Sequence, residues 1–207
     1  MKNNTVNIVY IDDISDISLS RYLNMNYCSQ SISGLENIKK NFIEKQFEKS
    51  DSYKSLIESE EVKTANVILI DNHLFQEQTS LISRFSGKQF KIILRKLLPY
   101  VEVIIITQDS TLVDHGIVPK YSQEKGNDPD KYYEAELAPV LDEAIREVLY
   151  FDKLANELQQ SEDIERILVD KIINSIDGDG SYDSLTKSDI DQLINSFKEL
   201  KDACTKK

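Results

Sequence analysis

The sequence predicts an α/β protein in which helices cover both faces of a parallel sheet. Three short runs rich in Val and Ile, each bounded by polar turns, lie at residues 6–11, 66–70 and 101–106. Runs of this kind are typical of strands buried on both faces. The gaps between them carry apolar residues at helical spacing. Alternation of strand and helix predicts a doubly wound sheet.

The first gap is expected to hold both a strand and a helix. A weak strand signal lies near Tyr27–Ile32. Further along the gap, Leu35, Ile38 and Phe42 follow one another at helical spacing.

The second gap predicts a helix that ends at Pro99, because proline cannot continue a helix. Its apolar residues at helical spacing are Phe90, Ile93, Leu94 and Leu97. After the third run, a short polar connection leads to a further strand at Ile117–Tyr121. Five strands are therefore expected.

From Asp130 onward the chain has no strand candidate and is expected to be helical. Apolar residues mark three amphipathic segments, at 141–158, 164–176 and 190–200. We therefore expect an α/β domain at residues 1–155 and a helical extension at residues 156–207.

Charge and hydropathy exclude several classes of function. The net charge is −11, with 36 acidic against 25 basic residues, and no segment resembles a basic recognition helix. This balance argues against binding to nucleic acid or to an anionic membrane surface. The apolar runs are too short for a membrane span and the N-terminus lacks a signal-peptide core, so a soluble, cytoplasmic protein is expected. Cys28 and Cys204 form no zinc-binding pattern.

Polar side chains follow the predicted strands where each strand ends. Asp12 and Asp13 end the first strand, Asp71 the third, Thr107 the fourth and Lys120 the fifth. Ligands bind outside the carboxyl ends of parallel strands. Three carboxylates there require a cation, and oxygen ligands of this kind suit Mg²⁺. One carboxylate can then attack a phosphoryl group, whose oxygens the hydroxyl and the ammonium bind.

This ordered set resembles the receiver domain of two-component response regulators. The resemblance rests on the acid pair, Asp71, Thr107 and the segment "GIVPK" ending at Lys120, and it covers roughly residues 5–155. It implies a flavodoxin-like sheet of five parallel strands in the order 2-1-3-4-5, with helices on both faces.

The resemblance also implies a role for each site residue. Asp71 would be the phosphoacceptor, and Thr107 and Lys120 would contact its phosphoryl group. The implied ligands of Mg²⁺ are Asp13, Asp71 and the backbone carbonyl of His73, with Asp12 assisting.

The chain departs from the usual receiver pattern in four places, one of which is Leu74 and Phe75, where receivers commonly carry Met and Pro. The segment 14–64 is longer than in a typical receiver, and we expect a lengthened second helix there. The interval from Thr107 to Lys120 is short, so the fourth helix is expected to be cut to about one turn. Ile117 stands where receivers usually carry an aromatic residue.

Three functions can be considered for these residues, and the first two are consistent with all of them. The first is a phosphoacceptor signalling protein, phosphorylated on Asp71 by a histidine kinase or a small-molecule phosphodonor. It would catalyse only its own phosphorylation and dephosphorylation. Its acidic tail predicts output through a downstream protein partner or through self-association as a homodimer. The second is a pseudo-receiver, a binding or scaffold module that is not phosphorylated. The third, a hydrolase, lacks an additional general base.

Overall fold

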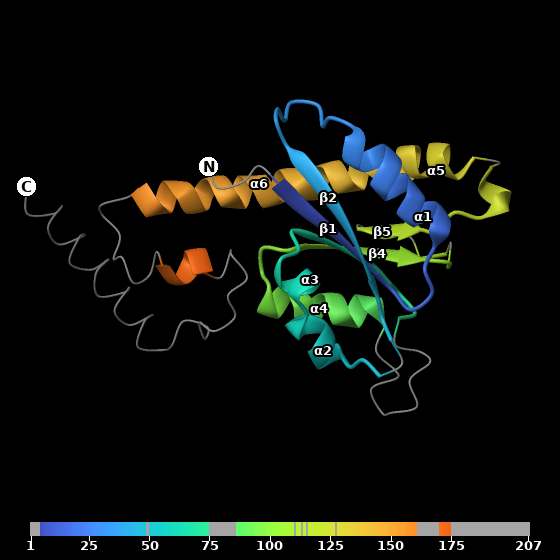
Figure 1. Cartoon of the computed structure of the whole chain (residues 1–207), viewed down its shortest axis with the longest axis horizontal. Helices are drawn as coiled ribbons and strands as arrows, with labels where there is room; N and C mark the ends of the chain where they lie inside the picture. Colours follow the sequence, from blue (N-terminus) through green and yellow to red (C-terminus); the bar gives the residue numbers. More distant parts are fainter. Residues whose placement is uncertain are drawn as a thin grey trace, which may run out of the picture.

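The protein is built on a sheet of five parallel strands in the order β2-β1-β3-β4-β5 (Figure 1). The computed structural model describes residues 5–48, 50–74, 86–109, 111–112, 114, 116–126, 128–160 and 170–174. The strands are β1 (Thr5–Asp12), β2 (Lys39–Gln46), β3 (Val67–Asp71), β4 (Glu102–Thr107) and β5 (Ile117–Pro119). This is the flavodoxin-like order that the resemblance to receiver domains implied.

The three apolar runs form the central strands. β3 is buried along its whole length, and β1 and β4 are buried at nearly every position. Ile11 of β1 is in register with Ile70 of β3. The residues that follow, Asp12 and Asp71, are therefore brought to the same edge of the sheet.

Helices cover both faces of the sheet, as predicted (Figure 1). One face is covered by α1 (Ile17–Arg21), the π-helical turn η1 (Tyr22–Asn26), the 3-10 turn η2 (Tyr27–Ser29), α5 (Pro129–Glu136) and α6 (Ala138–Gln160). The other face is covered by α2 (Tyr53–Glu58), α3 (Glu60–Lys63) and α4 (Gly87–Leu97). A last 3-10 turn, η3 (Gln123–Lys125), lies between β5 and α5. Alternate residues of the strands supply the two cores.

The helix predicted in the second gap is confirmed as α4. Ser86 and Gln89 form a reciprocal capping box at its start, which satisfies two backbone N–H groups. The helix ends at Leu97, shortly before Pro99. Phe90 and Leu94 are fully buried against the sheet.

The second strand is not where the sequence predicted it. The segment Tyr27–Ile32 begins as the 3-10 turn η2, and the strand lies instead at Lys39–Gln46. The helix predicted from Leu35, Ile38 and Phe42 is also wrong, because Phe42 belongs to this strand. β2 is an edge strand with mostly exposed or half-exposed residues, so it lacks the continuous apolar run that reveals a central strand.

The extra residues between β1 and β3 do not lengthen the second helix, and that prediction is wrong too. α2 and α3 have only six and four residues. Before β2, α1 continues into η1 and η2, and a loop follows. Two buried tyrosines attach this segment to the helices beside it: the hydroxyl of Tyr22 donates to Glu134 (2.8 Å), and that of Tyr27 donates to Asp142 (2.7 Å).

The sequence predicted a fourth helix cut to about one turn between β4 and β5, and the described residues there form turns and no helix. At the other end of the chain, α6 continues without a break across the expected domain boundary at 155/156. Residues 170–174 are helical, and the rest of the expected extension lies outside the described residues. The division into two domains therefore stays a prediction. Within the described part of the chain, no helix is long and apolar enough to cross a membrane.

Candidate functional site

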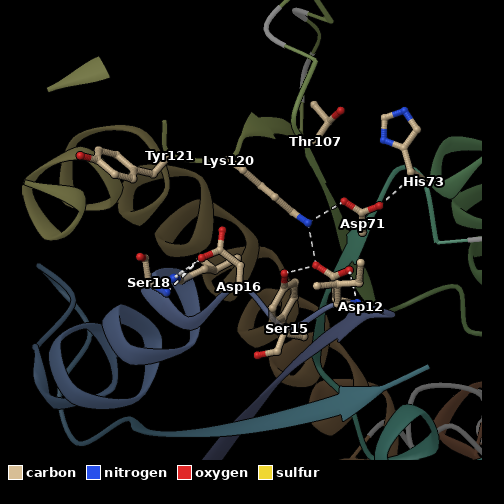
Figure 2. Close-up of polar contacts among 12 residues, drawn as sticks. Asp12, Ser15, Asp16, Ser18, Asp71, His73, Thr107, Lys120 and Tyr121 are labelled. Carbon is tan, nitrogen blue, oxygen red and sulfur yellow. Dashed lines mark hydrogen bonds and ion pairs between the residues drawn. The ribbon is translucent and has the colours of Figure 1, made fainter. Parts of the chain in front are cut away.

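Lys120 lies between two buried carboxylates at the carboxyl edge of the sheet (Figure 2). Its Nζ is 2.7 Å from Oδ2 of Asp12 and 2.9 Å from Oδ1 of Asp71. Lys120 is 9% exposed, and each aspartate is 4% exposed. The sequence placed these three residues at the ends of three different strands, and the sheet brings them into direct contact.

Asp12, Asp13 and Asp71 form an acidic cluster. Each offers a carboxylate oxygen, and these oxygens lie within 4.8 Å of one another. Ligand oxygens on opposite sides of a magnesium ion are about 4.2 Å apart, since each bond is about 2.1 Å long. Asp13 is half-buried, and the other two are buried. The residues present therefore fit a hard divalent cation.

The charged groups of the cluster act on one another. Burial, followed by the hydrogen bond and the charge of Asp12, raises the pKa of Asp13 above its ordinary value of 3.8. For Lys120, burial opposes the charged form, but the hydrogen bonds and charges of Asp12 and Asp71 outweigh it. The net effect is to raise the pKa of Lys120 above 10.5, so its ammonium is retained at neutral pH.

Further donors hold the two buried carboxylates in place. The backbone N–H of His73 donates to Oδ2 of Asp71 (2.6 Å), and that of Ile14 donates to Oδ1 of Asp12 (3.2 Å). The hydroxyl of Tyr10 donates to Oδ2 of Asp12. His73 thus reaches the site through its backbone, and the role of its carbonyl as a metal ligand stays a prediction.

Tyr10 is a site residue that the sequence reasoning missed. It is fully buried, and burial, together with the neighbouring Asp12, raises the pKa of its phenol. A signal was available, because residues two apart in a strand point to the same face of the sheet. A tyrosine two positions before a strand-end aspartate is placed to reach its carboxylate.

Thr107 lies at the same edge, one strand away from Asp71 (Figure 2). It is fully buried, and its carbonyl accepts the backbone N–H of Lys120 (2.6 Å). Its Oγ1 accepts the backbone N–H of Asp109 (3.1 Å), so its own hydroxyl proton is left to donate. The predicted residue is therefore fixed beside the strand that carries Lys120.

Gly87 is a second residue that the sequence reasoning missed. Its N–H donates to the carbonyl of Asn72 (2.9 Å), so the start of α4 packs directly on the residues that end β3. A Cβ at this position would lie 2.6 Å from the carbonyl oxygen of Asp71. Only glycine permits this close approach, and the contact helps to fix the backbone that carries the central carboxylate.

No protein-family model matches the chain, and no curated protein matches it. Two solved structures are similar to it in part. The first is a two-component transcriptional regulator AraC from Clostridium phytofermentans ISDg, with 18% identity, 72% of this chain and 98% of that chain covered, and a TM-score of 0.41. The second is the two-component response regulator RcsB in a complex with DNA, with 13% identity, 94% of this chain and 98% of that chain covered, and a TM-score of 0.37. At these scores neither likeness carries an argument, and the fold rests on the observed strand order.

Proposed function

We propose that the chain is a phosphoacceptor signalling protein in which Asp71 accepts a phosphoryl group with the help of Mg²⁺. The observation that supports this most directly is the buried contact of Lys120 with Asp12 and Asp71, with Asp13 beside them. An aspartate held between an ammonium and two further carboxylates has the partners that acyl phosphate formation requires.

The proposed reaction uses the chain's own residues as follows. A carboxylate oxygen of Asp71 attacks the phosphorus of the donor, a new P–O bond forms, and the bond to the leaving group breaks. The ammonium of Lys120 moves to one oxygen of the transferred phosphoryl group, and the hydroxyl of Thr107 donates a hydrogen bond to another of its oxygens. A bound magnesium ion would be held by Asp12, Asp13, Asp71 and the carbonyl of His73, and would neutralise charge on the phosphoryl oxygens.

The proposal assigns the chain no activity on other substrates beyond its own phosphorylation and dephosphorylation. The donor is a histidine kinase or a small phosphodonor in the cytoplasm. The output is a protein partner or a second copy of the chain, contacted through the helical tail. The acidic composition disfavours nucleic acid as the target.

Intact mass measurement tests the proposal. With Mg²⁺ and acetyl phosphate, the native protein should gain one phosphoryl mass, and Asp71→Asn should gain none. Asp109→Asn is the matched control, because Asp109 is an exposed acid near the same edge and should leave phosphorylation intact. A native protein that binds Mg²⁺ but forms no phosphoprotein with acetyl phosphate or phosphoramidate would contradict the proposal.

A second candidate function is a binding module of the same fold that is not phosphorylated. The specific observation in its favour is that the described residues between β4 and β5 form turns and no helix, and that Ile117 stands where receivers usually carry an aromatic residue. The same mass measurement separates the two functions, because a binding module gains no mass with any donor while its helical tail still engages a partner.

A further inference from the structure

The carboxylate of Asp12 receives three donors in the structure. Oδ2 accepts the hydroxyl of Tyr10 and the ammonium of Lys120 (2.7 Å), and Oδ1 accepts the backbone N–H of Ile14 (3.2 Å). Figure 2 shows the ammonium of Lys120 reaching this carboxylate and that of Asp71. Asp12 is therefore the most fully hydrogen-bonded acid in the described cluster.

Each carboxylate oxygen has about two lone-pair directions. In Asp12, both directions of Oδ2 are used, by Tyr10 and Lys120. One direction of Oδ1 is used by Ile14, so the remaining direction of Oδ1 is the one open to the carboxyl of Asp13, which hydrogen-bonds to Asp12, or to a cation in its place. The hydrogen-bond pattern thus determines which oxygen of Asp12 can act as a ligand.

Among the two donors to Oδ2, only Tyr10 is suited to hold Asp12 throughout the proposed reaction. Lys120 also contacts Asp71 and must move to the transferred group. Tyr10 belongs to the same strand as Asp12, is fully buried, and has no such second role. Its hydroxyl can keep Oδ2 occupied while Lys120 leaves.

We infer that Tyr10 is a positioning residue: its hydroxyl fixes the carboxylate of Asp12 so that Oδ1 faces the cation, and it sustains the affinity of the acidic cluster for Mg²⁺. The inference rests on the proposed function for the identity of the cation. Partners that orient a metal ligand without touching the metal typically change metal affinity by about tenfold to a hundredfold when removed. Tyr10 is expected to lie in this range.

The test is a titration of the full chain with Mg²⁺, monitored by NMR, which gives the dissociation constant of the ion. The backbone amides of Ile14 and His73 are the reporters, because they donate to Asp12 and Asp71. Tyr10→Phe removes the hydroxyl and keeps the ring, and it should raise the dissociation constant about tenfold or more. Tyr22→Phe is the matched control: Tyr22 is equally buried on the same face of the sheet, and its hydroxyl donates to Glu134, a carboxylate outside the cluster. The control should change the constant by less than about twofold.

The outcomes separate this inference from the proposed function. The positioning role is overturned if the Mg²⁺ dissociation constant of Tyr10→Phe is lower than the native value or within about twofold of it. It is also overturned if both variants weaken Mg²⁺ binding equally. Neither outcome affects the proposed phosphorylation of Asp71. A native protein that does not bind Mg²⁺ overturns both. If Tyr10→Phe does not fold, the hydroxyl proton of Tyr10 in the native protein is followed instead. This proton should stay protected and shift with the same midpoint as the amide of Ile14, and a signal that does not respond to Mg²⁺ overturns the inference.

Discussion

Replacing Lys120 by methionine removes the ammonium that pairs with Asp12 and Asp71 and keeps a side chain of similar length. The two ion pairs that the replacement breaks are 2.7 and 2.9 Å long, and all three residues are at least nine-tenths buried. Solvent therefore screens the remaining carboxylates poorly. The variant leaves two buried acids, with Asp13 beside them, without their counter-charge.

The expected cost follows from this burial. Removing one partner of a buried ion pair typically destabilises a protein by about 3–5 kcal/mol, because the other charge stays buried and unpaired. Here the third acid of the cluster, Asp13, is only half-buried, so solvent can relieve part of the uncompensated charge. We therefore expect a loss near the lower limit, about 3 kcal/mol in the free energy of unfolding at pH 7.

Urea denaturation in the presence of a chelator measures this loss. Lys45→Met is the control, because the pair of Lys45 and Glu61 is longer (3.3 Å) and partly exposed. It should cost less than about 1 kcal/mol. Adding Mg²⁺ should restore part of the stability of Lys120→Met, because the ion binds the folded acidic cluster and not the unfolded chain.

A loss for Lys120→Met no greater than that for Lys45→Met would refute the reasoning. It would mean that the buried carboxylates are compensated by other groups, and that Lys120 is not the counter-ion of the cluster.

Three further predictions concern residues around the site and on the helical face. Gly87→Ala should cost about 1–3 kcal/mol in urea denaturation and reduce phosphorylation, because the added Cβ overlaps the backbone of Asp71; unchanged stability would show that α4 can shift freely. Tyr133→Phe should cost about 1–3 kcal/mol, because the Tyr133 hydroxyl accepts the backbone N–H of Tyr121 and its loss leaves that donor unpaired; equal denaturation midpoints would refute this. Glu134 accepts hydrogen bonds from a glutamine and a tyrosine, which lower its pKa from the ordinary value of 4.5, so its contribution to stability is present above pH 4.5 and lost as the pH falls through the lower, folded-state pKa; a carboxyl titration by NMR that gives 4.5 or higher would contradict it.

The central strands and the acids at their ends could be predicted from the sequence because burial leaves a visible pattern. A strand buried on both faces needs a continuous apolar run, and β1, β3 and β4 each have one. Parallel strands then carry their carboxyl ends to one edge. The contact of Lys120 with Asp12 and Asp71 follows from this topology, although the residues are far apart in the chain.

The parts that could not be predicted depend on packing rather than on local pattern. β2 is half-exposed, so its sequence has no period that separates it from a helix. The π-helical turn η1 is held by Tyr22, whose acceptor Glu134 lies 112 residues away in the chain. Gly87 is required by backbone atoms of another element. A local pattern of hydrophobic spacing cannot reveal such contacts, because the two partners belong to different elements of the fold.

The 23 residues of α6 make it the longest described element of the protein. At a rise of 1.5 Å per residue the helix is about 34 Å long. Buried residues such as Leu141 and Ile145 hold its first half on the sheet, and Figure 1 shows the helix continuing past the end of the sheet. The second half of the helix therefore projects beyond the sheet, while the first half is fixed on it. Val148 of α6 still belongs to the core, and the 12 residues from there to Gln160 span about 18 Å, so a tilt of about 5° at Val148 displaces Gln160 by about 1.6 Å. Any tilt of α6 on the sheet therefore displaces the residues near Gln160 further than those that pack on the core.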